Sequence, residues 1–184
     1  MIQSPHSKVR LNTSSEGKLQ EYQRLFSQYN VLVEATSVDI DEIDADTVSV
    51  VAHKASQVPE GVLVEDTSLD IEGARVGVHI RWFLDHLNEL QGHKARWISL
   101  LAKRVQSKIY IYLGEIEGTI VRKRGSEGFG FDPYFLPHGE KETLAESKPD
   151  RLNARALAIS AFMEGKESYI VDPIYKWEGN WQCD

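Results

Sequence analysis

The first part of the chain alternates between strand-like and helix-like hydrophobic patterns. Val9 and Leu11 alternate with polar residues and predict a strand over residues 8–13. Apolar residues at helical spacing predict a helix over residues 16–29, and residues 31–38 have the pattern of a second strand. Strand, helix and strand in this order predict a βαβ unit with a right-handed crossover.

The rest of the chain has a less regular hydrophobic pattern. We predict a helix over residues 46–58 with Asp46 as its N-cap, and then an apolar strand that ends at Val64. Further on we predict helices over residues 79–90 and 94–104, a hairpin of strands 108–113 and 118–124, and a helix over residues 150–164 that Gly165 ends. The aromatic residues after Lys166 predict either an added strand or an arm that packs on a partner.

Composition narrows the class of protein. The chain has 184 residues, of which 41% are hydrophobic and 27% are charged. We expect residues 1–184 to form one α/β domain with a proper core. A net charge of −7 argues against broad binding to nucleic acids, and no apolar run approaches the ~18 residues of a membrane span. The polar N-terminus lacks a signal core, and the single cysteine, Cys183, allows no internal disulfide. A cytoplasmic protein is expected.

Two short runs carry the strongest chemical signal. Glu65 and Asp66 follow the apolar residues 61–64, and an acid pair at a strand end suits a hard cation such as Mg²⁺. Residues 128–135 place Phe129 between two glycines, where a planar ring can stack on a nucleotide base. Each run alone is also compatible with a buried strand end or an aromatic turn, but together they favour an enzyme that acts on nucleotides.

The loop between the first strand and the first helix is a second candidate. Residues 13–18 (Thr-Ser-Ser-Glu-Gly-Lys) place free backbone N–H groups, hydroxyls and Lys18 at a helix N-terminus, which attracts anions. The run lacks the Gly-x4-Gly-Lys pattern of a P-loop. The alternative interpretation is a serine N-cap next to a solvated lysine.

Acidic and histidine residues give weaker signals. An acidic run precedes the second predicted helix and fails the EF-hand pattern, so it is either a solvated loop or the source of one extra metal ligand: Asp39, Asp41, Glu42, Asp44 and Asp46. His79, His86 and His93 are spaced by seven residues, which on a helix separates neighbours by roughly 10 Å. That is too far to share a metal, so we interpret these histidines as structural or surface residues.

The motifs, taken in order, resemble the Ham1/inosine triphosphate pyrophosphatase family. The resemblance covers about residues 10–162 and rests on four runs: 64–69, 77–84, 129–135 and 143–146. It implies a two-lobed α/β fold with a long mixed central sheet, flanking helices and a central substrate cleft. It further implies a homodimer and hydrolysis of non-standard purine nucleoside triphosphates (ITP, dITP, XTP) to monophosphate and pyrophosphate. Mg²⁺ is the implied cofactor, and Mn²⁺ suits the same oxygen ligands.

The same resemblance assigns roles to residues of this sequence. Catalysis falls to Asp66 and Lys18, and metal binding to Glu42, Asp66 and Glu65. Substrate binding falls to residues from four separate parts of the chain: Thr13, Ser15, Lys18, Lys54, Phe129, Asp132 and Arg155.

The chain departs from the family pattern in the base-recognition motif. Where the family has Lys-Asn-x-x-Ser-His-Arg, one alignment keeps Asn153 as the asparagine and loses Ser-His-Arg. The preferred alignment deletes about three residues and places Asn153, Ala154 and Arg155 on Ser-His-Arg, so the histidine is absent either way. Ser15 stands where the family has asparagine. Two alternatives therefore stay open: a nucleotide-binding protein with weakened catalysis, and a pyrophosphatase retuned to another nucleotide.

Overall fold

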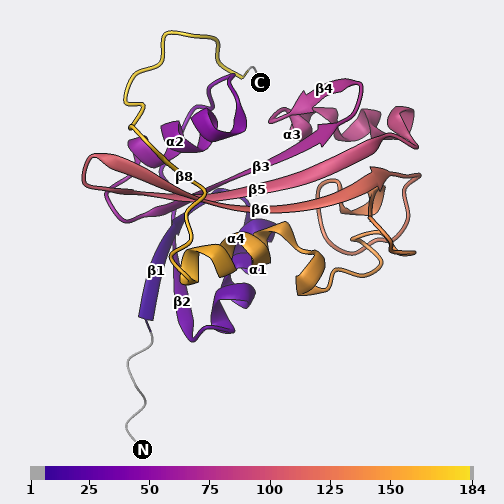
Figure 1. Cartoon of the computed structure of the whole chain (residues 1–184), viewed down its shortest axis with the longest axis horizontal. Helices are drawn as coiled ribbons and strands as arrows, with labels where there is room; N and C mark the ends of the chain where they lie inside the picture. The colour runs from indigo at the N-terminus through magenta and orange to yellow at the C-terminus, as the bar shows by residue number, and fades with distance from the viewer. Residues whose placement is uncertain (1–6, 183–184) are drawn as a thin grey trace, which may run out of the picture.

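The computed structural model describes residues 7–182, which form a mixed sheet of eight strands with helices on both faces (Figure 1). The strand order is β2-β1-β3-β5-β6-β7, with β4 paired to β3 and β8 paired to β6. The strands are β1 (Ser7–Asn12), β2 (Val31–Thr36), β3 (Leu63–Ile71), β4 (Ala74–Gly77), β5 (Lys94–Val105), β6 (Lys108–Ile120), β7 (Phe135–Pro137) and β8 (Tyr169–Val171). The predicted fold class is confirmed.

Helices cover the two faces unequally. The α-helices are α1 (Glu16–Ser27), α2 (Thr47–Gln57), α3 (Ile80–Phe83) and α4 (Ala154–Met163). Short 3₁₀ helices are η1 (Leu84–Leu90), η2 (Asp132–Tyr134) and η3 (Asp150–Leu152). Figure 1 shows α2 on one face of the sheet and α1 with α4 on the other.

The predicted βαβ unit is present. β1 and β2 pair in parallel with α1 between them, and β1 also pairs in parallel with β3. Tyr22, Leu25 and Phe26 of α1 are buried against Ile159 of α4. Burial of this apolar stripe holds α1 against the sheet. Residues 13–15 form the loop that joins the C-terminal end of β1 to the start of α1.

Three predictions in the middle of the chain are wrong. The strand predicted to end at Val64 continues to Ile71, so Glu65 and Asp66 lie within β3 and not at a strand end. Residues 94–104, predicted as a helix, form strand β5, and the predicted hairpin of 108–113 with 118–124 is one continuous strand, β6, paired along its length with β5. β5 is a central strand with apolar side chains on both faces, so it lacks the alternation that marks a half-buried strand. β6 runs without a break through residues 114–117, where the turn of the predicted hairpin was placed.

The remaining elements follow their predictions in part. The predicted helix 79–90 consists of α3 and η1, and the late helix begins at Ala154 after the separate turn η3. Gly165 has a φ of +64°, as expected of a residue that ends a helix. The aromatic tail contributes β8, an added strand on β6.

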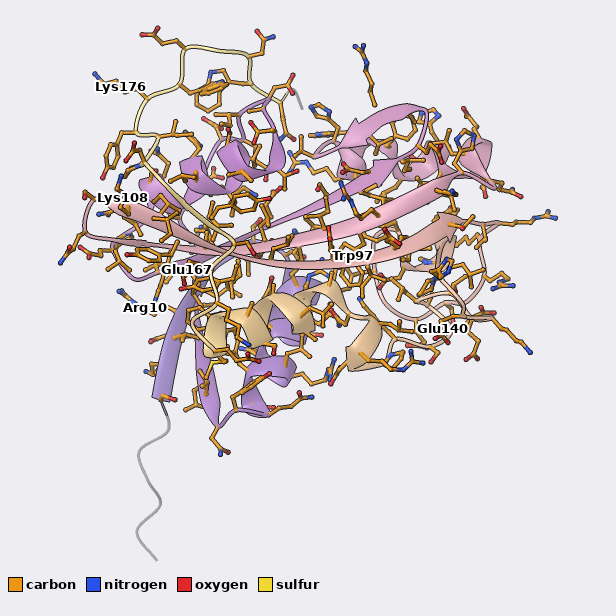
Figure 2. All side chains as sticks on the ribbon, viewed as in Figure 1. Arg10, Trp97, Lys108, Glu140, Glu167 and Lys176 are labelled. Atoms are coloured by element: carbon orange, nitrogen blue, oxygen red, sulfur yellow. The ribbon has the colours of Figure 1, made fainter. Side chains whose placement is uncertain are left out.

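The core consists of three clusters. One lies under α2, the second lies between α1 and α4, and the third lies at the far end of the β5–β6 hairpin around Trp97 and Phe135. Trp97 is fully buried near the centre of the molecule (Figure 2). No helix among residues 7–182 is long and apolar enough to cross a membrane.

Candidate active site

A cleft of about 1000 Å³ opens between the clusters of the core. It is lined by the end of β1, the loop before α2, the centre of β3 and the start of α4. Every site residue predicted from the sequence lines it: Thr13, Ser15, Lys18, Glu42, Lys54, Glu65, Asp66, Phe129, Asp132 and Arg155. Residues from separate parts of the chain thus meet in one place.

The loop after β1 is built as a helix cap. Ser15 is the N-cap of α1, and its hydroxyl accepts the Lys18 backbone N–H at 3.4 Å. The Ser15 N–H in turn donates to the Thr13 hydroxyl at 3.2 Å. The serine cap of the alternative interpretation is therefore present, but Lys18 is only partly exposed, and its ammonium donates to Glu65 at 2.6 Å.

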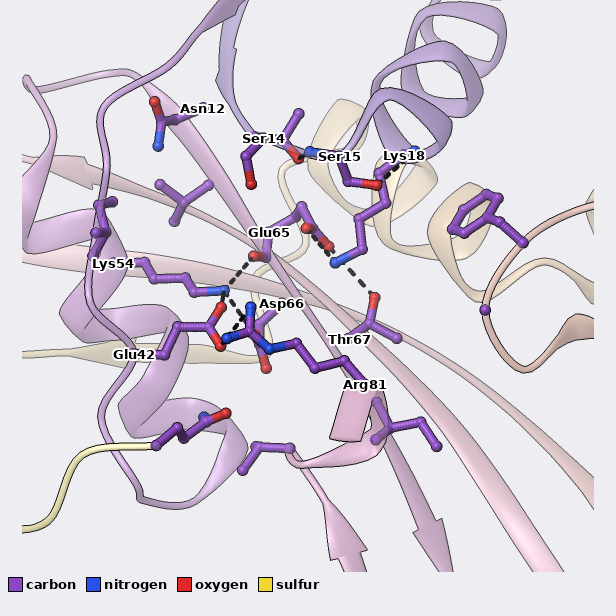
Figure 3. Close-up of a pocket in the computed structure, with 18 of the residues that line it drawn as sticks. Asn12, Ser14, Ser15, Lys18, Glu42, Lys54, Glu65, Asp66, Thr67 and Arg81 are labelled. Atoms are coloured by element: carbon purple, nitrogen blue, oxygen red, sulfur yellow. Dashed lines mark hydrogen bonds and ion pairs between the residues drawn. The ribbon is translucent and has the colours of Figure 1, made fainter. Parts of the chain in front are cut away.

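Lysines and carboxylates alternate across the floor of the cleft (Figure 3). The Lys54 ammonium lies 2.8 Å from Glu42 and 2.9 Å from Asp66. Arg81 approaches Glu42 from the other side at 3.9 Å. Glu42 is therefore an ion-paired residue of the cleft, and the acidic run is not simply a solvated loop.

Burial and neighbouring charges give the two acids of β3 different proton affinities. Burial raises the pKa of the Asp66 carboxyl above its usual value, and Lys54 and Lys18 offset this only in part. Burial acts in the same direction on Glu65, but Lys18, Lys54 and Arg155 outweigh it and lower its pKa. Asp66 is thus the carboxylate with the greater proton affinity. Asp66, Glu42 and Glu65 raise the pKa of Lys54 despite its burial, so Lys54 stays charged.

The other end of the cleft is aromatic. The Phe129 ring packs on Gly17 of α1, where an added Cβ would lie 3.1 Å from the ring. Gly128 has a φ of +76°, and the Phe129 N–H donates to the buried carboxylate of Asp132 at 3.0 Å. This turn fixes both predicted base-binding residues, Phe129 and Asp132, on the same wall.

A buried ionic network that the sequence did not predict supports this wall. Glu21 of α1 pairs with Arg155 at 3.2 Å and with Lys148 at 3.2 Å, and it accepts a hydrogen bond from the Asn153 amide. Lys148 also reaches Asp132 at 3.1 Å. Arg155 and Lys148 lie over the rings of Trp97 and Phe129 at 4.9–5.2 Å. No pattern in the sequence marked Glu21 or Lys148.

Glycine sets the position of α4. A Cβ at Gly114 of β6 would overlap the backbone of Ala154. The start of α4 therefore lies directly on the sheet, where Asn153 caps the helix and Arg155 donates to Thr67 of β3 at 3.1 Å. In the structure Arg155, with 2% of its surface exposed, lies in the cleft, as the preferred alignment requires.

The donor set suits a hard cation, although no closely spaced group of metal ligands is assembled within residues 7–182. Glu42, Glu65 and Asp66 line the same cleft, but lysine ammonium groups lie between them. The Asp66 Oδ2 atom is buried and has no hydrogen-bond partner. A buried carboxylate oxygen without a donor is a costly arrangement, and either a bound cation or a proton taken up from water would relieve it.

The histidines lie outside the cleft lining and serve different local contacts. His79 pairs with Asp44, His86 with Glu89, and His93 with the carbonyl of Glu72. They do not converge on one point, in agreement with the structural role predicted for them.

Comparison with known proteins identifies the family of the chain. The model of the Ham1 family matches residues 9–165. The chain belongs to the Ham1 family. It is 31% identical to a dITP/XTP pyrophosphatase of Methanopyrus kandleri, over 85% of this chain and 95% of that protein. It is 30% identical to an inosine triphosphate pyrophosphatase of Yarrowia lipolytica, over 77% and 85%.

The fold agrees with this membership. The structure of a HAM1 protein from Coxiella burnetii superposes with a TM-score of 0.70 at 21% identity, over 86% of this chain and 98% of that one. The predicted family and the predicted architecture are both confirmed. The roles of the individual residues stay predictions.

Proposed function

We propose that this Ham1 family member hydrolyses non-standard purine nucleoside triphosphates, such as ITP, dITP and XTP, to the monophosphate and pyrophosphate with the help of Mg²⁺. The class of enzyme, a hydrolase of triphosphate anhydrides, follows from the names of its relatives. The observation that carries the proposal is the lysine–carboxylate array of Lys18, Lys54, Glu42, Glu65 and Asp66 on the floor of a cleft with an aromatic far wall.

The array is suited to a polyphosphate. The ammonium groups of Lys18 and Lys54 pair with carboxylates in the free protein, and a bound triphosphate offers them further anionic partners. Their charge then offsets the negative charge that develops on the phosphates during cleavage. The N–H groups at the start of α1 and the hydroxyls of Thr13 and Ser15 add neutral donors.

Asp66 is the residue that fits proton transfer. Its raised pKa makes it the better base of the acid pair, and its free Oδ2 atom can accept the proton of an attacking water. Water adds across the α–β phosphate linkage, so the monophosphate and pyrophosphate leave as the two products. A divalent cation held by Glu42, Glu65 and Asp66 would supply charge neutralisation and acidify the attacking water.

The far wall supplies base recognition. Phe129 offers its ring for stacking, and Asp132 and Arg155, which line the same end of the cleft, offer an acceptor and donors. Arg155 matches the chemistry of a 6-oxo group, which accepts hydrogen bonds, whereas the 6-amino group of adenine donates them. Since the family histidine is absent, Arg155 carries this selection without it.

The test is pyrophosphate release from ITP, dITP, XTP and the standard nucleotides at matched concentrations, with Mg²⁺, with Mn²⁺ and with a chelator. We expect preference for the 6-oxopurines and no turnover with the chelator. Activity centred on another nucleotide would mean a retuned base pocket. Binding without any release at high protein concentration would replace the proposal by that of a nucleotide-binding protein. A homodimer and a cytoplasmic location stay predictions, and light scattering of the purified chain tests the dimer.

A further inference from the structure

The C-terminal residues 166–182, here called the C-terminal strap, lie beyond the family match, which ends at residue 165. The strap leaves α4, pairs with β6 as β8, and then passes along α2 (Figure 1). Its course is fixed by specific contacts: the Ile174 N–H donates to the Ser56 hydroxyl at 2.8 Å, and the Gln57 amide donates to the Ile174 carbonyl at 3.2 Å. Residues outside the shared family region are therefore anchored on the helix that carries Lys54.

The end of the strap binds the backbone of the loop that carries Glu42. Trp181 forms an antiparallel bridge with Ile43, and the Gln182 N–H donates to the Glu42 carbonyl at 2.8 Å. The Asp44 N–H donates to the Asn180 carbonyl at 2.9 Å. The Gln182 side-chain amide adds a bond to the Ile43 carbonyl at 3.1 Å. Polar backbone groups on both sides of Glu42 are thereby satisfied by the strap.

The strap also reaches the cleft itself. Trp181 and Gln182 are among the lining residues, and the Trp181 ring packs edge-on against His53 of α2 at 5.5 Å. Ile43, which the strap covers, is fully buried. The Glu42 side chain thus pairs with Lys54, while the backbone of its loop is hydrogen-bonded to the C-terminal strap.

We propose that the C-terminal strap is a positioning element of the active cleft: it holds the Glu42 loop in the conformation that presents Glu42 beside Asp66. The inference rests on the proposed function for its kinetic consequence, but the contacts themselves are independent of it. Groups that orient a metal-binding carboxylate contribute to metal affinity although they never touch the metal. Loosening the strap should therefore weaken cation binding more than the chemical step.

The test compares full-length Gln182→Pro, which removes the N–H bonded to Glu42, with the wild type. Tyr175→Ala is the matched control, because its side chain is in the strap but 58% exposed and outside the cleft. Trp181→Ala provides a second variant if Gln182→Pro does not fold. We expect the Mg²⁺ concentration for half-maximal activity to rise about 10–100-fold in Gln182→Pro and in Trp181→Ala, and to stay unchanged in Tyr175→Ala. Saturating Mg²⁺ should restore most of kcat, which a general loss of folding would not allow.

A second readout separates the strap from the reaction. Hydrogen exchange at the Asp44 amide should be at least about tenfold faster in Gln182→Pro than in the wild type or Tyr175→Ala. If the wild type released no pyrophosphate, the proposed function would fail, and faster exchange would still support the strap. Unchanged Asp44 exchange, or an unchanged Mg²⁺ requirement in an active enzyme, would overturn the inference.

Discussion

Asp66 combines two features that Glu65 and Glu42 lack. All three carboxylates pair with a lysine, and both Glu65 and Asp66 are buried. Only in Asp66 does burial outweigh the lysines and raise the pKa, and its Oδ2 atom has no hydrogen-bond partner. A buried carboxylate with an unsatisfied oxygen is expensive to keep unless it has a task. This is the physical reason to assign proton transfer to Asp66.

Asp66→Asn tests that assignment. The amide keeps the size of the side chain but can neither accept the proton nor bind a cation strongly, so we expect turnover to fall at least about 100-fold. Unfolding temperature should not fall, because a buried charge is removed. Pyrophosphate release and thermal unfolding are the measurements.

Asp70→Asn serves as the control for this variant. Asp70 lies on the same strand, β3, but its side chain is 47% exposed and pairs with Arg96 outside the cleft. This variant should keep the wild-type rate. Near-normal activity of Asp66→Asn would show that another group is the base.

The sequence predicted the residues of the cleft better than their supports. Lys18, Asp66 and Phe129 were found because glycines, acids and lysines stand in a recognisable order. Glu21 and Lys148 were missed because their role depends on a contact between α1 and the segment before α4, which no local pattern encodes. A residue that acts only through a distant partner leaves little signal in its own neighbourhood.

At the level of elements, the errors fall where the chain is buried on both faces. β1, α1, β2 and α2 were predicted because each has one apolar and one polar side. β5 has no polar side through its middle, so its apolar run fitted a helix as well as a strand. The predicted hairpin turn of residues 114–117 is instead part of β6, and Gly114 within it makes room for α4.

Gly114→Ala tests how closely α4 must lie on the sheet. The added methyl group would overlap the Ala154 backbone, which cannot move aside as a flexible side chain would. We expect a loss of about 1–3 kcal/mol in the free energy of unfolding and a fall in activity, because the start of α4 also places Arg155. Urea unfolding and the KM for ITP are the measurements.

Glu115→Ala is the control for the substitution at Gly114. Glu115 is the next residue of β6, and its 45% exposed side chain makes only a surface ion pair with Arg96. Its removal should change the unfolding free energy by less than about 1 kcal/mol. Equal stability of the two variants would mean that α4 can shift at no cost.

At the scale of the whole molecule, the cleft exists because separate core clusters share one long hairpin. β5 and β6 run from the cluster under α2 to the cluster around Trp97. Glu21 then joins the parts across the cleft wall, since it binds Arg155 of α4 and Lys148, which in turn binds Asp132. Global stability should therefore depend on the charge of one glutamate.

Glu21→Gln tests this dependence through pH. Burial raises the pKa of Glu21, but Arg155, Lys148 and Asn153 outweigh it, so the pKa lies below its ordinary value of 4.5. The folded protein thus holds the proton less tightly than the unfolded chain. The stabilisation from the Glu21 charge is present above pH 4.5 and is lost as the pH falls through the lowered pKa of the folded state.

Near pH 7, we expect the free energy of unfolding of Glu21→Gln to be about 1–3 kcal/mol lower than that of the wild type, because buried cations lose their partner. The gap should close only as the pH falls below 4.5, where Glu21 takes up its proton. Urea unfolding of both proteins across this range measures the gap, with Glu16→Gln, on the exposed side of α1, as the control. A gap that stays constant down to acid pH would show that shape, and not charge, gives Glu21 its effect.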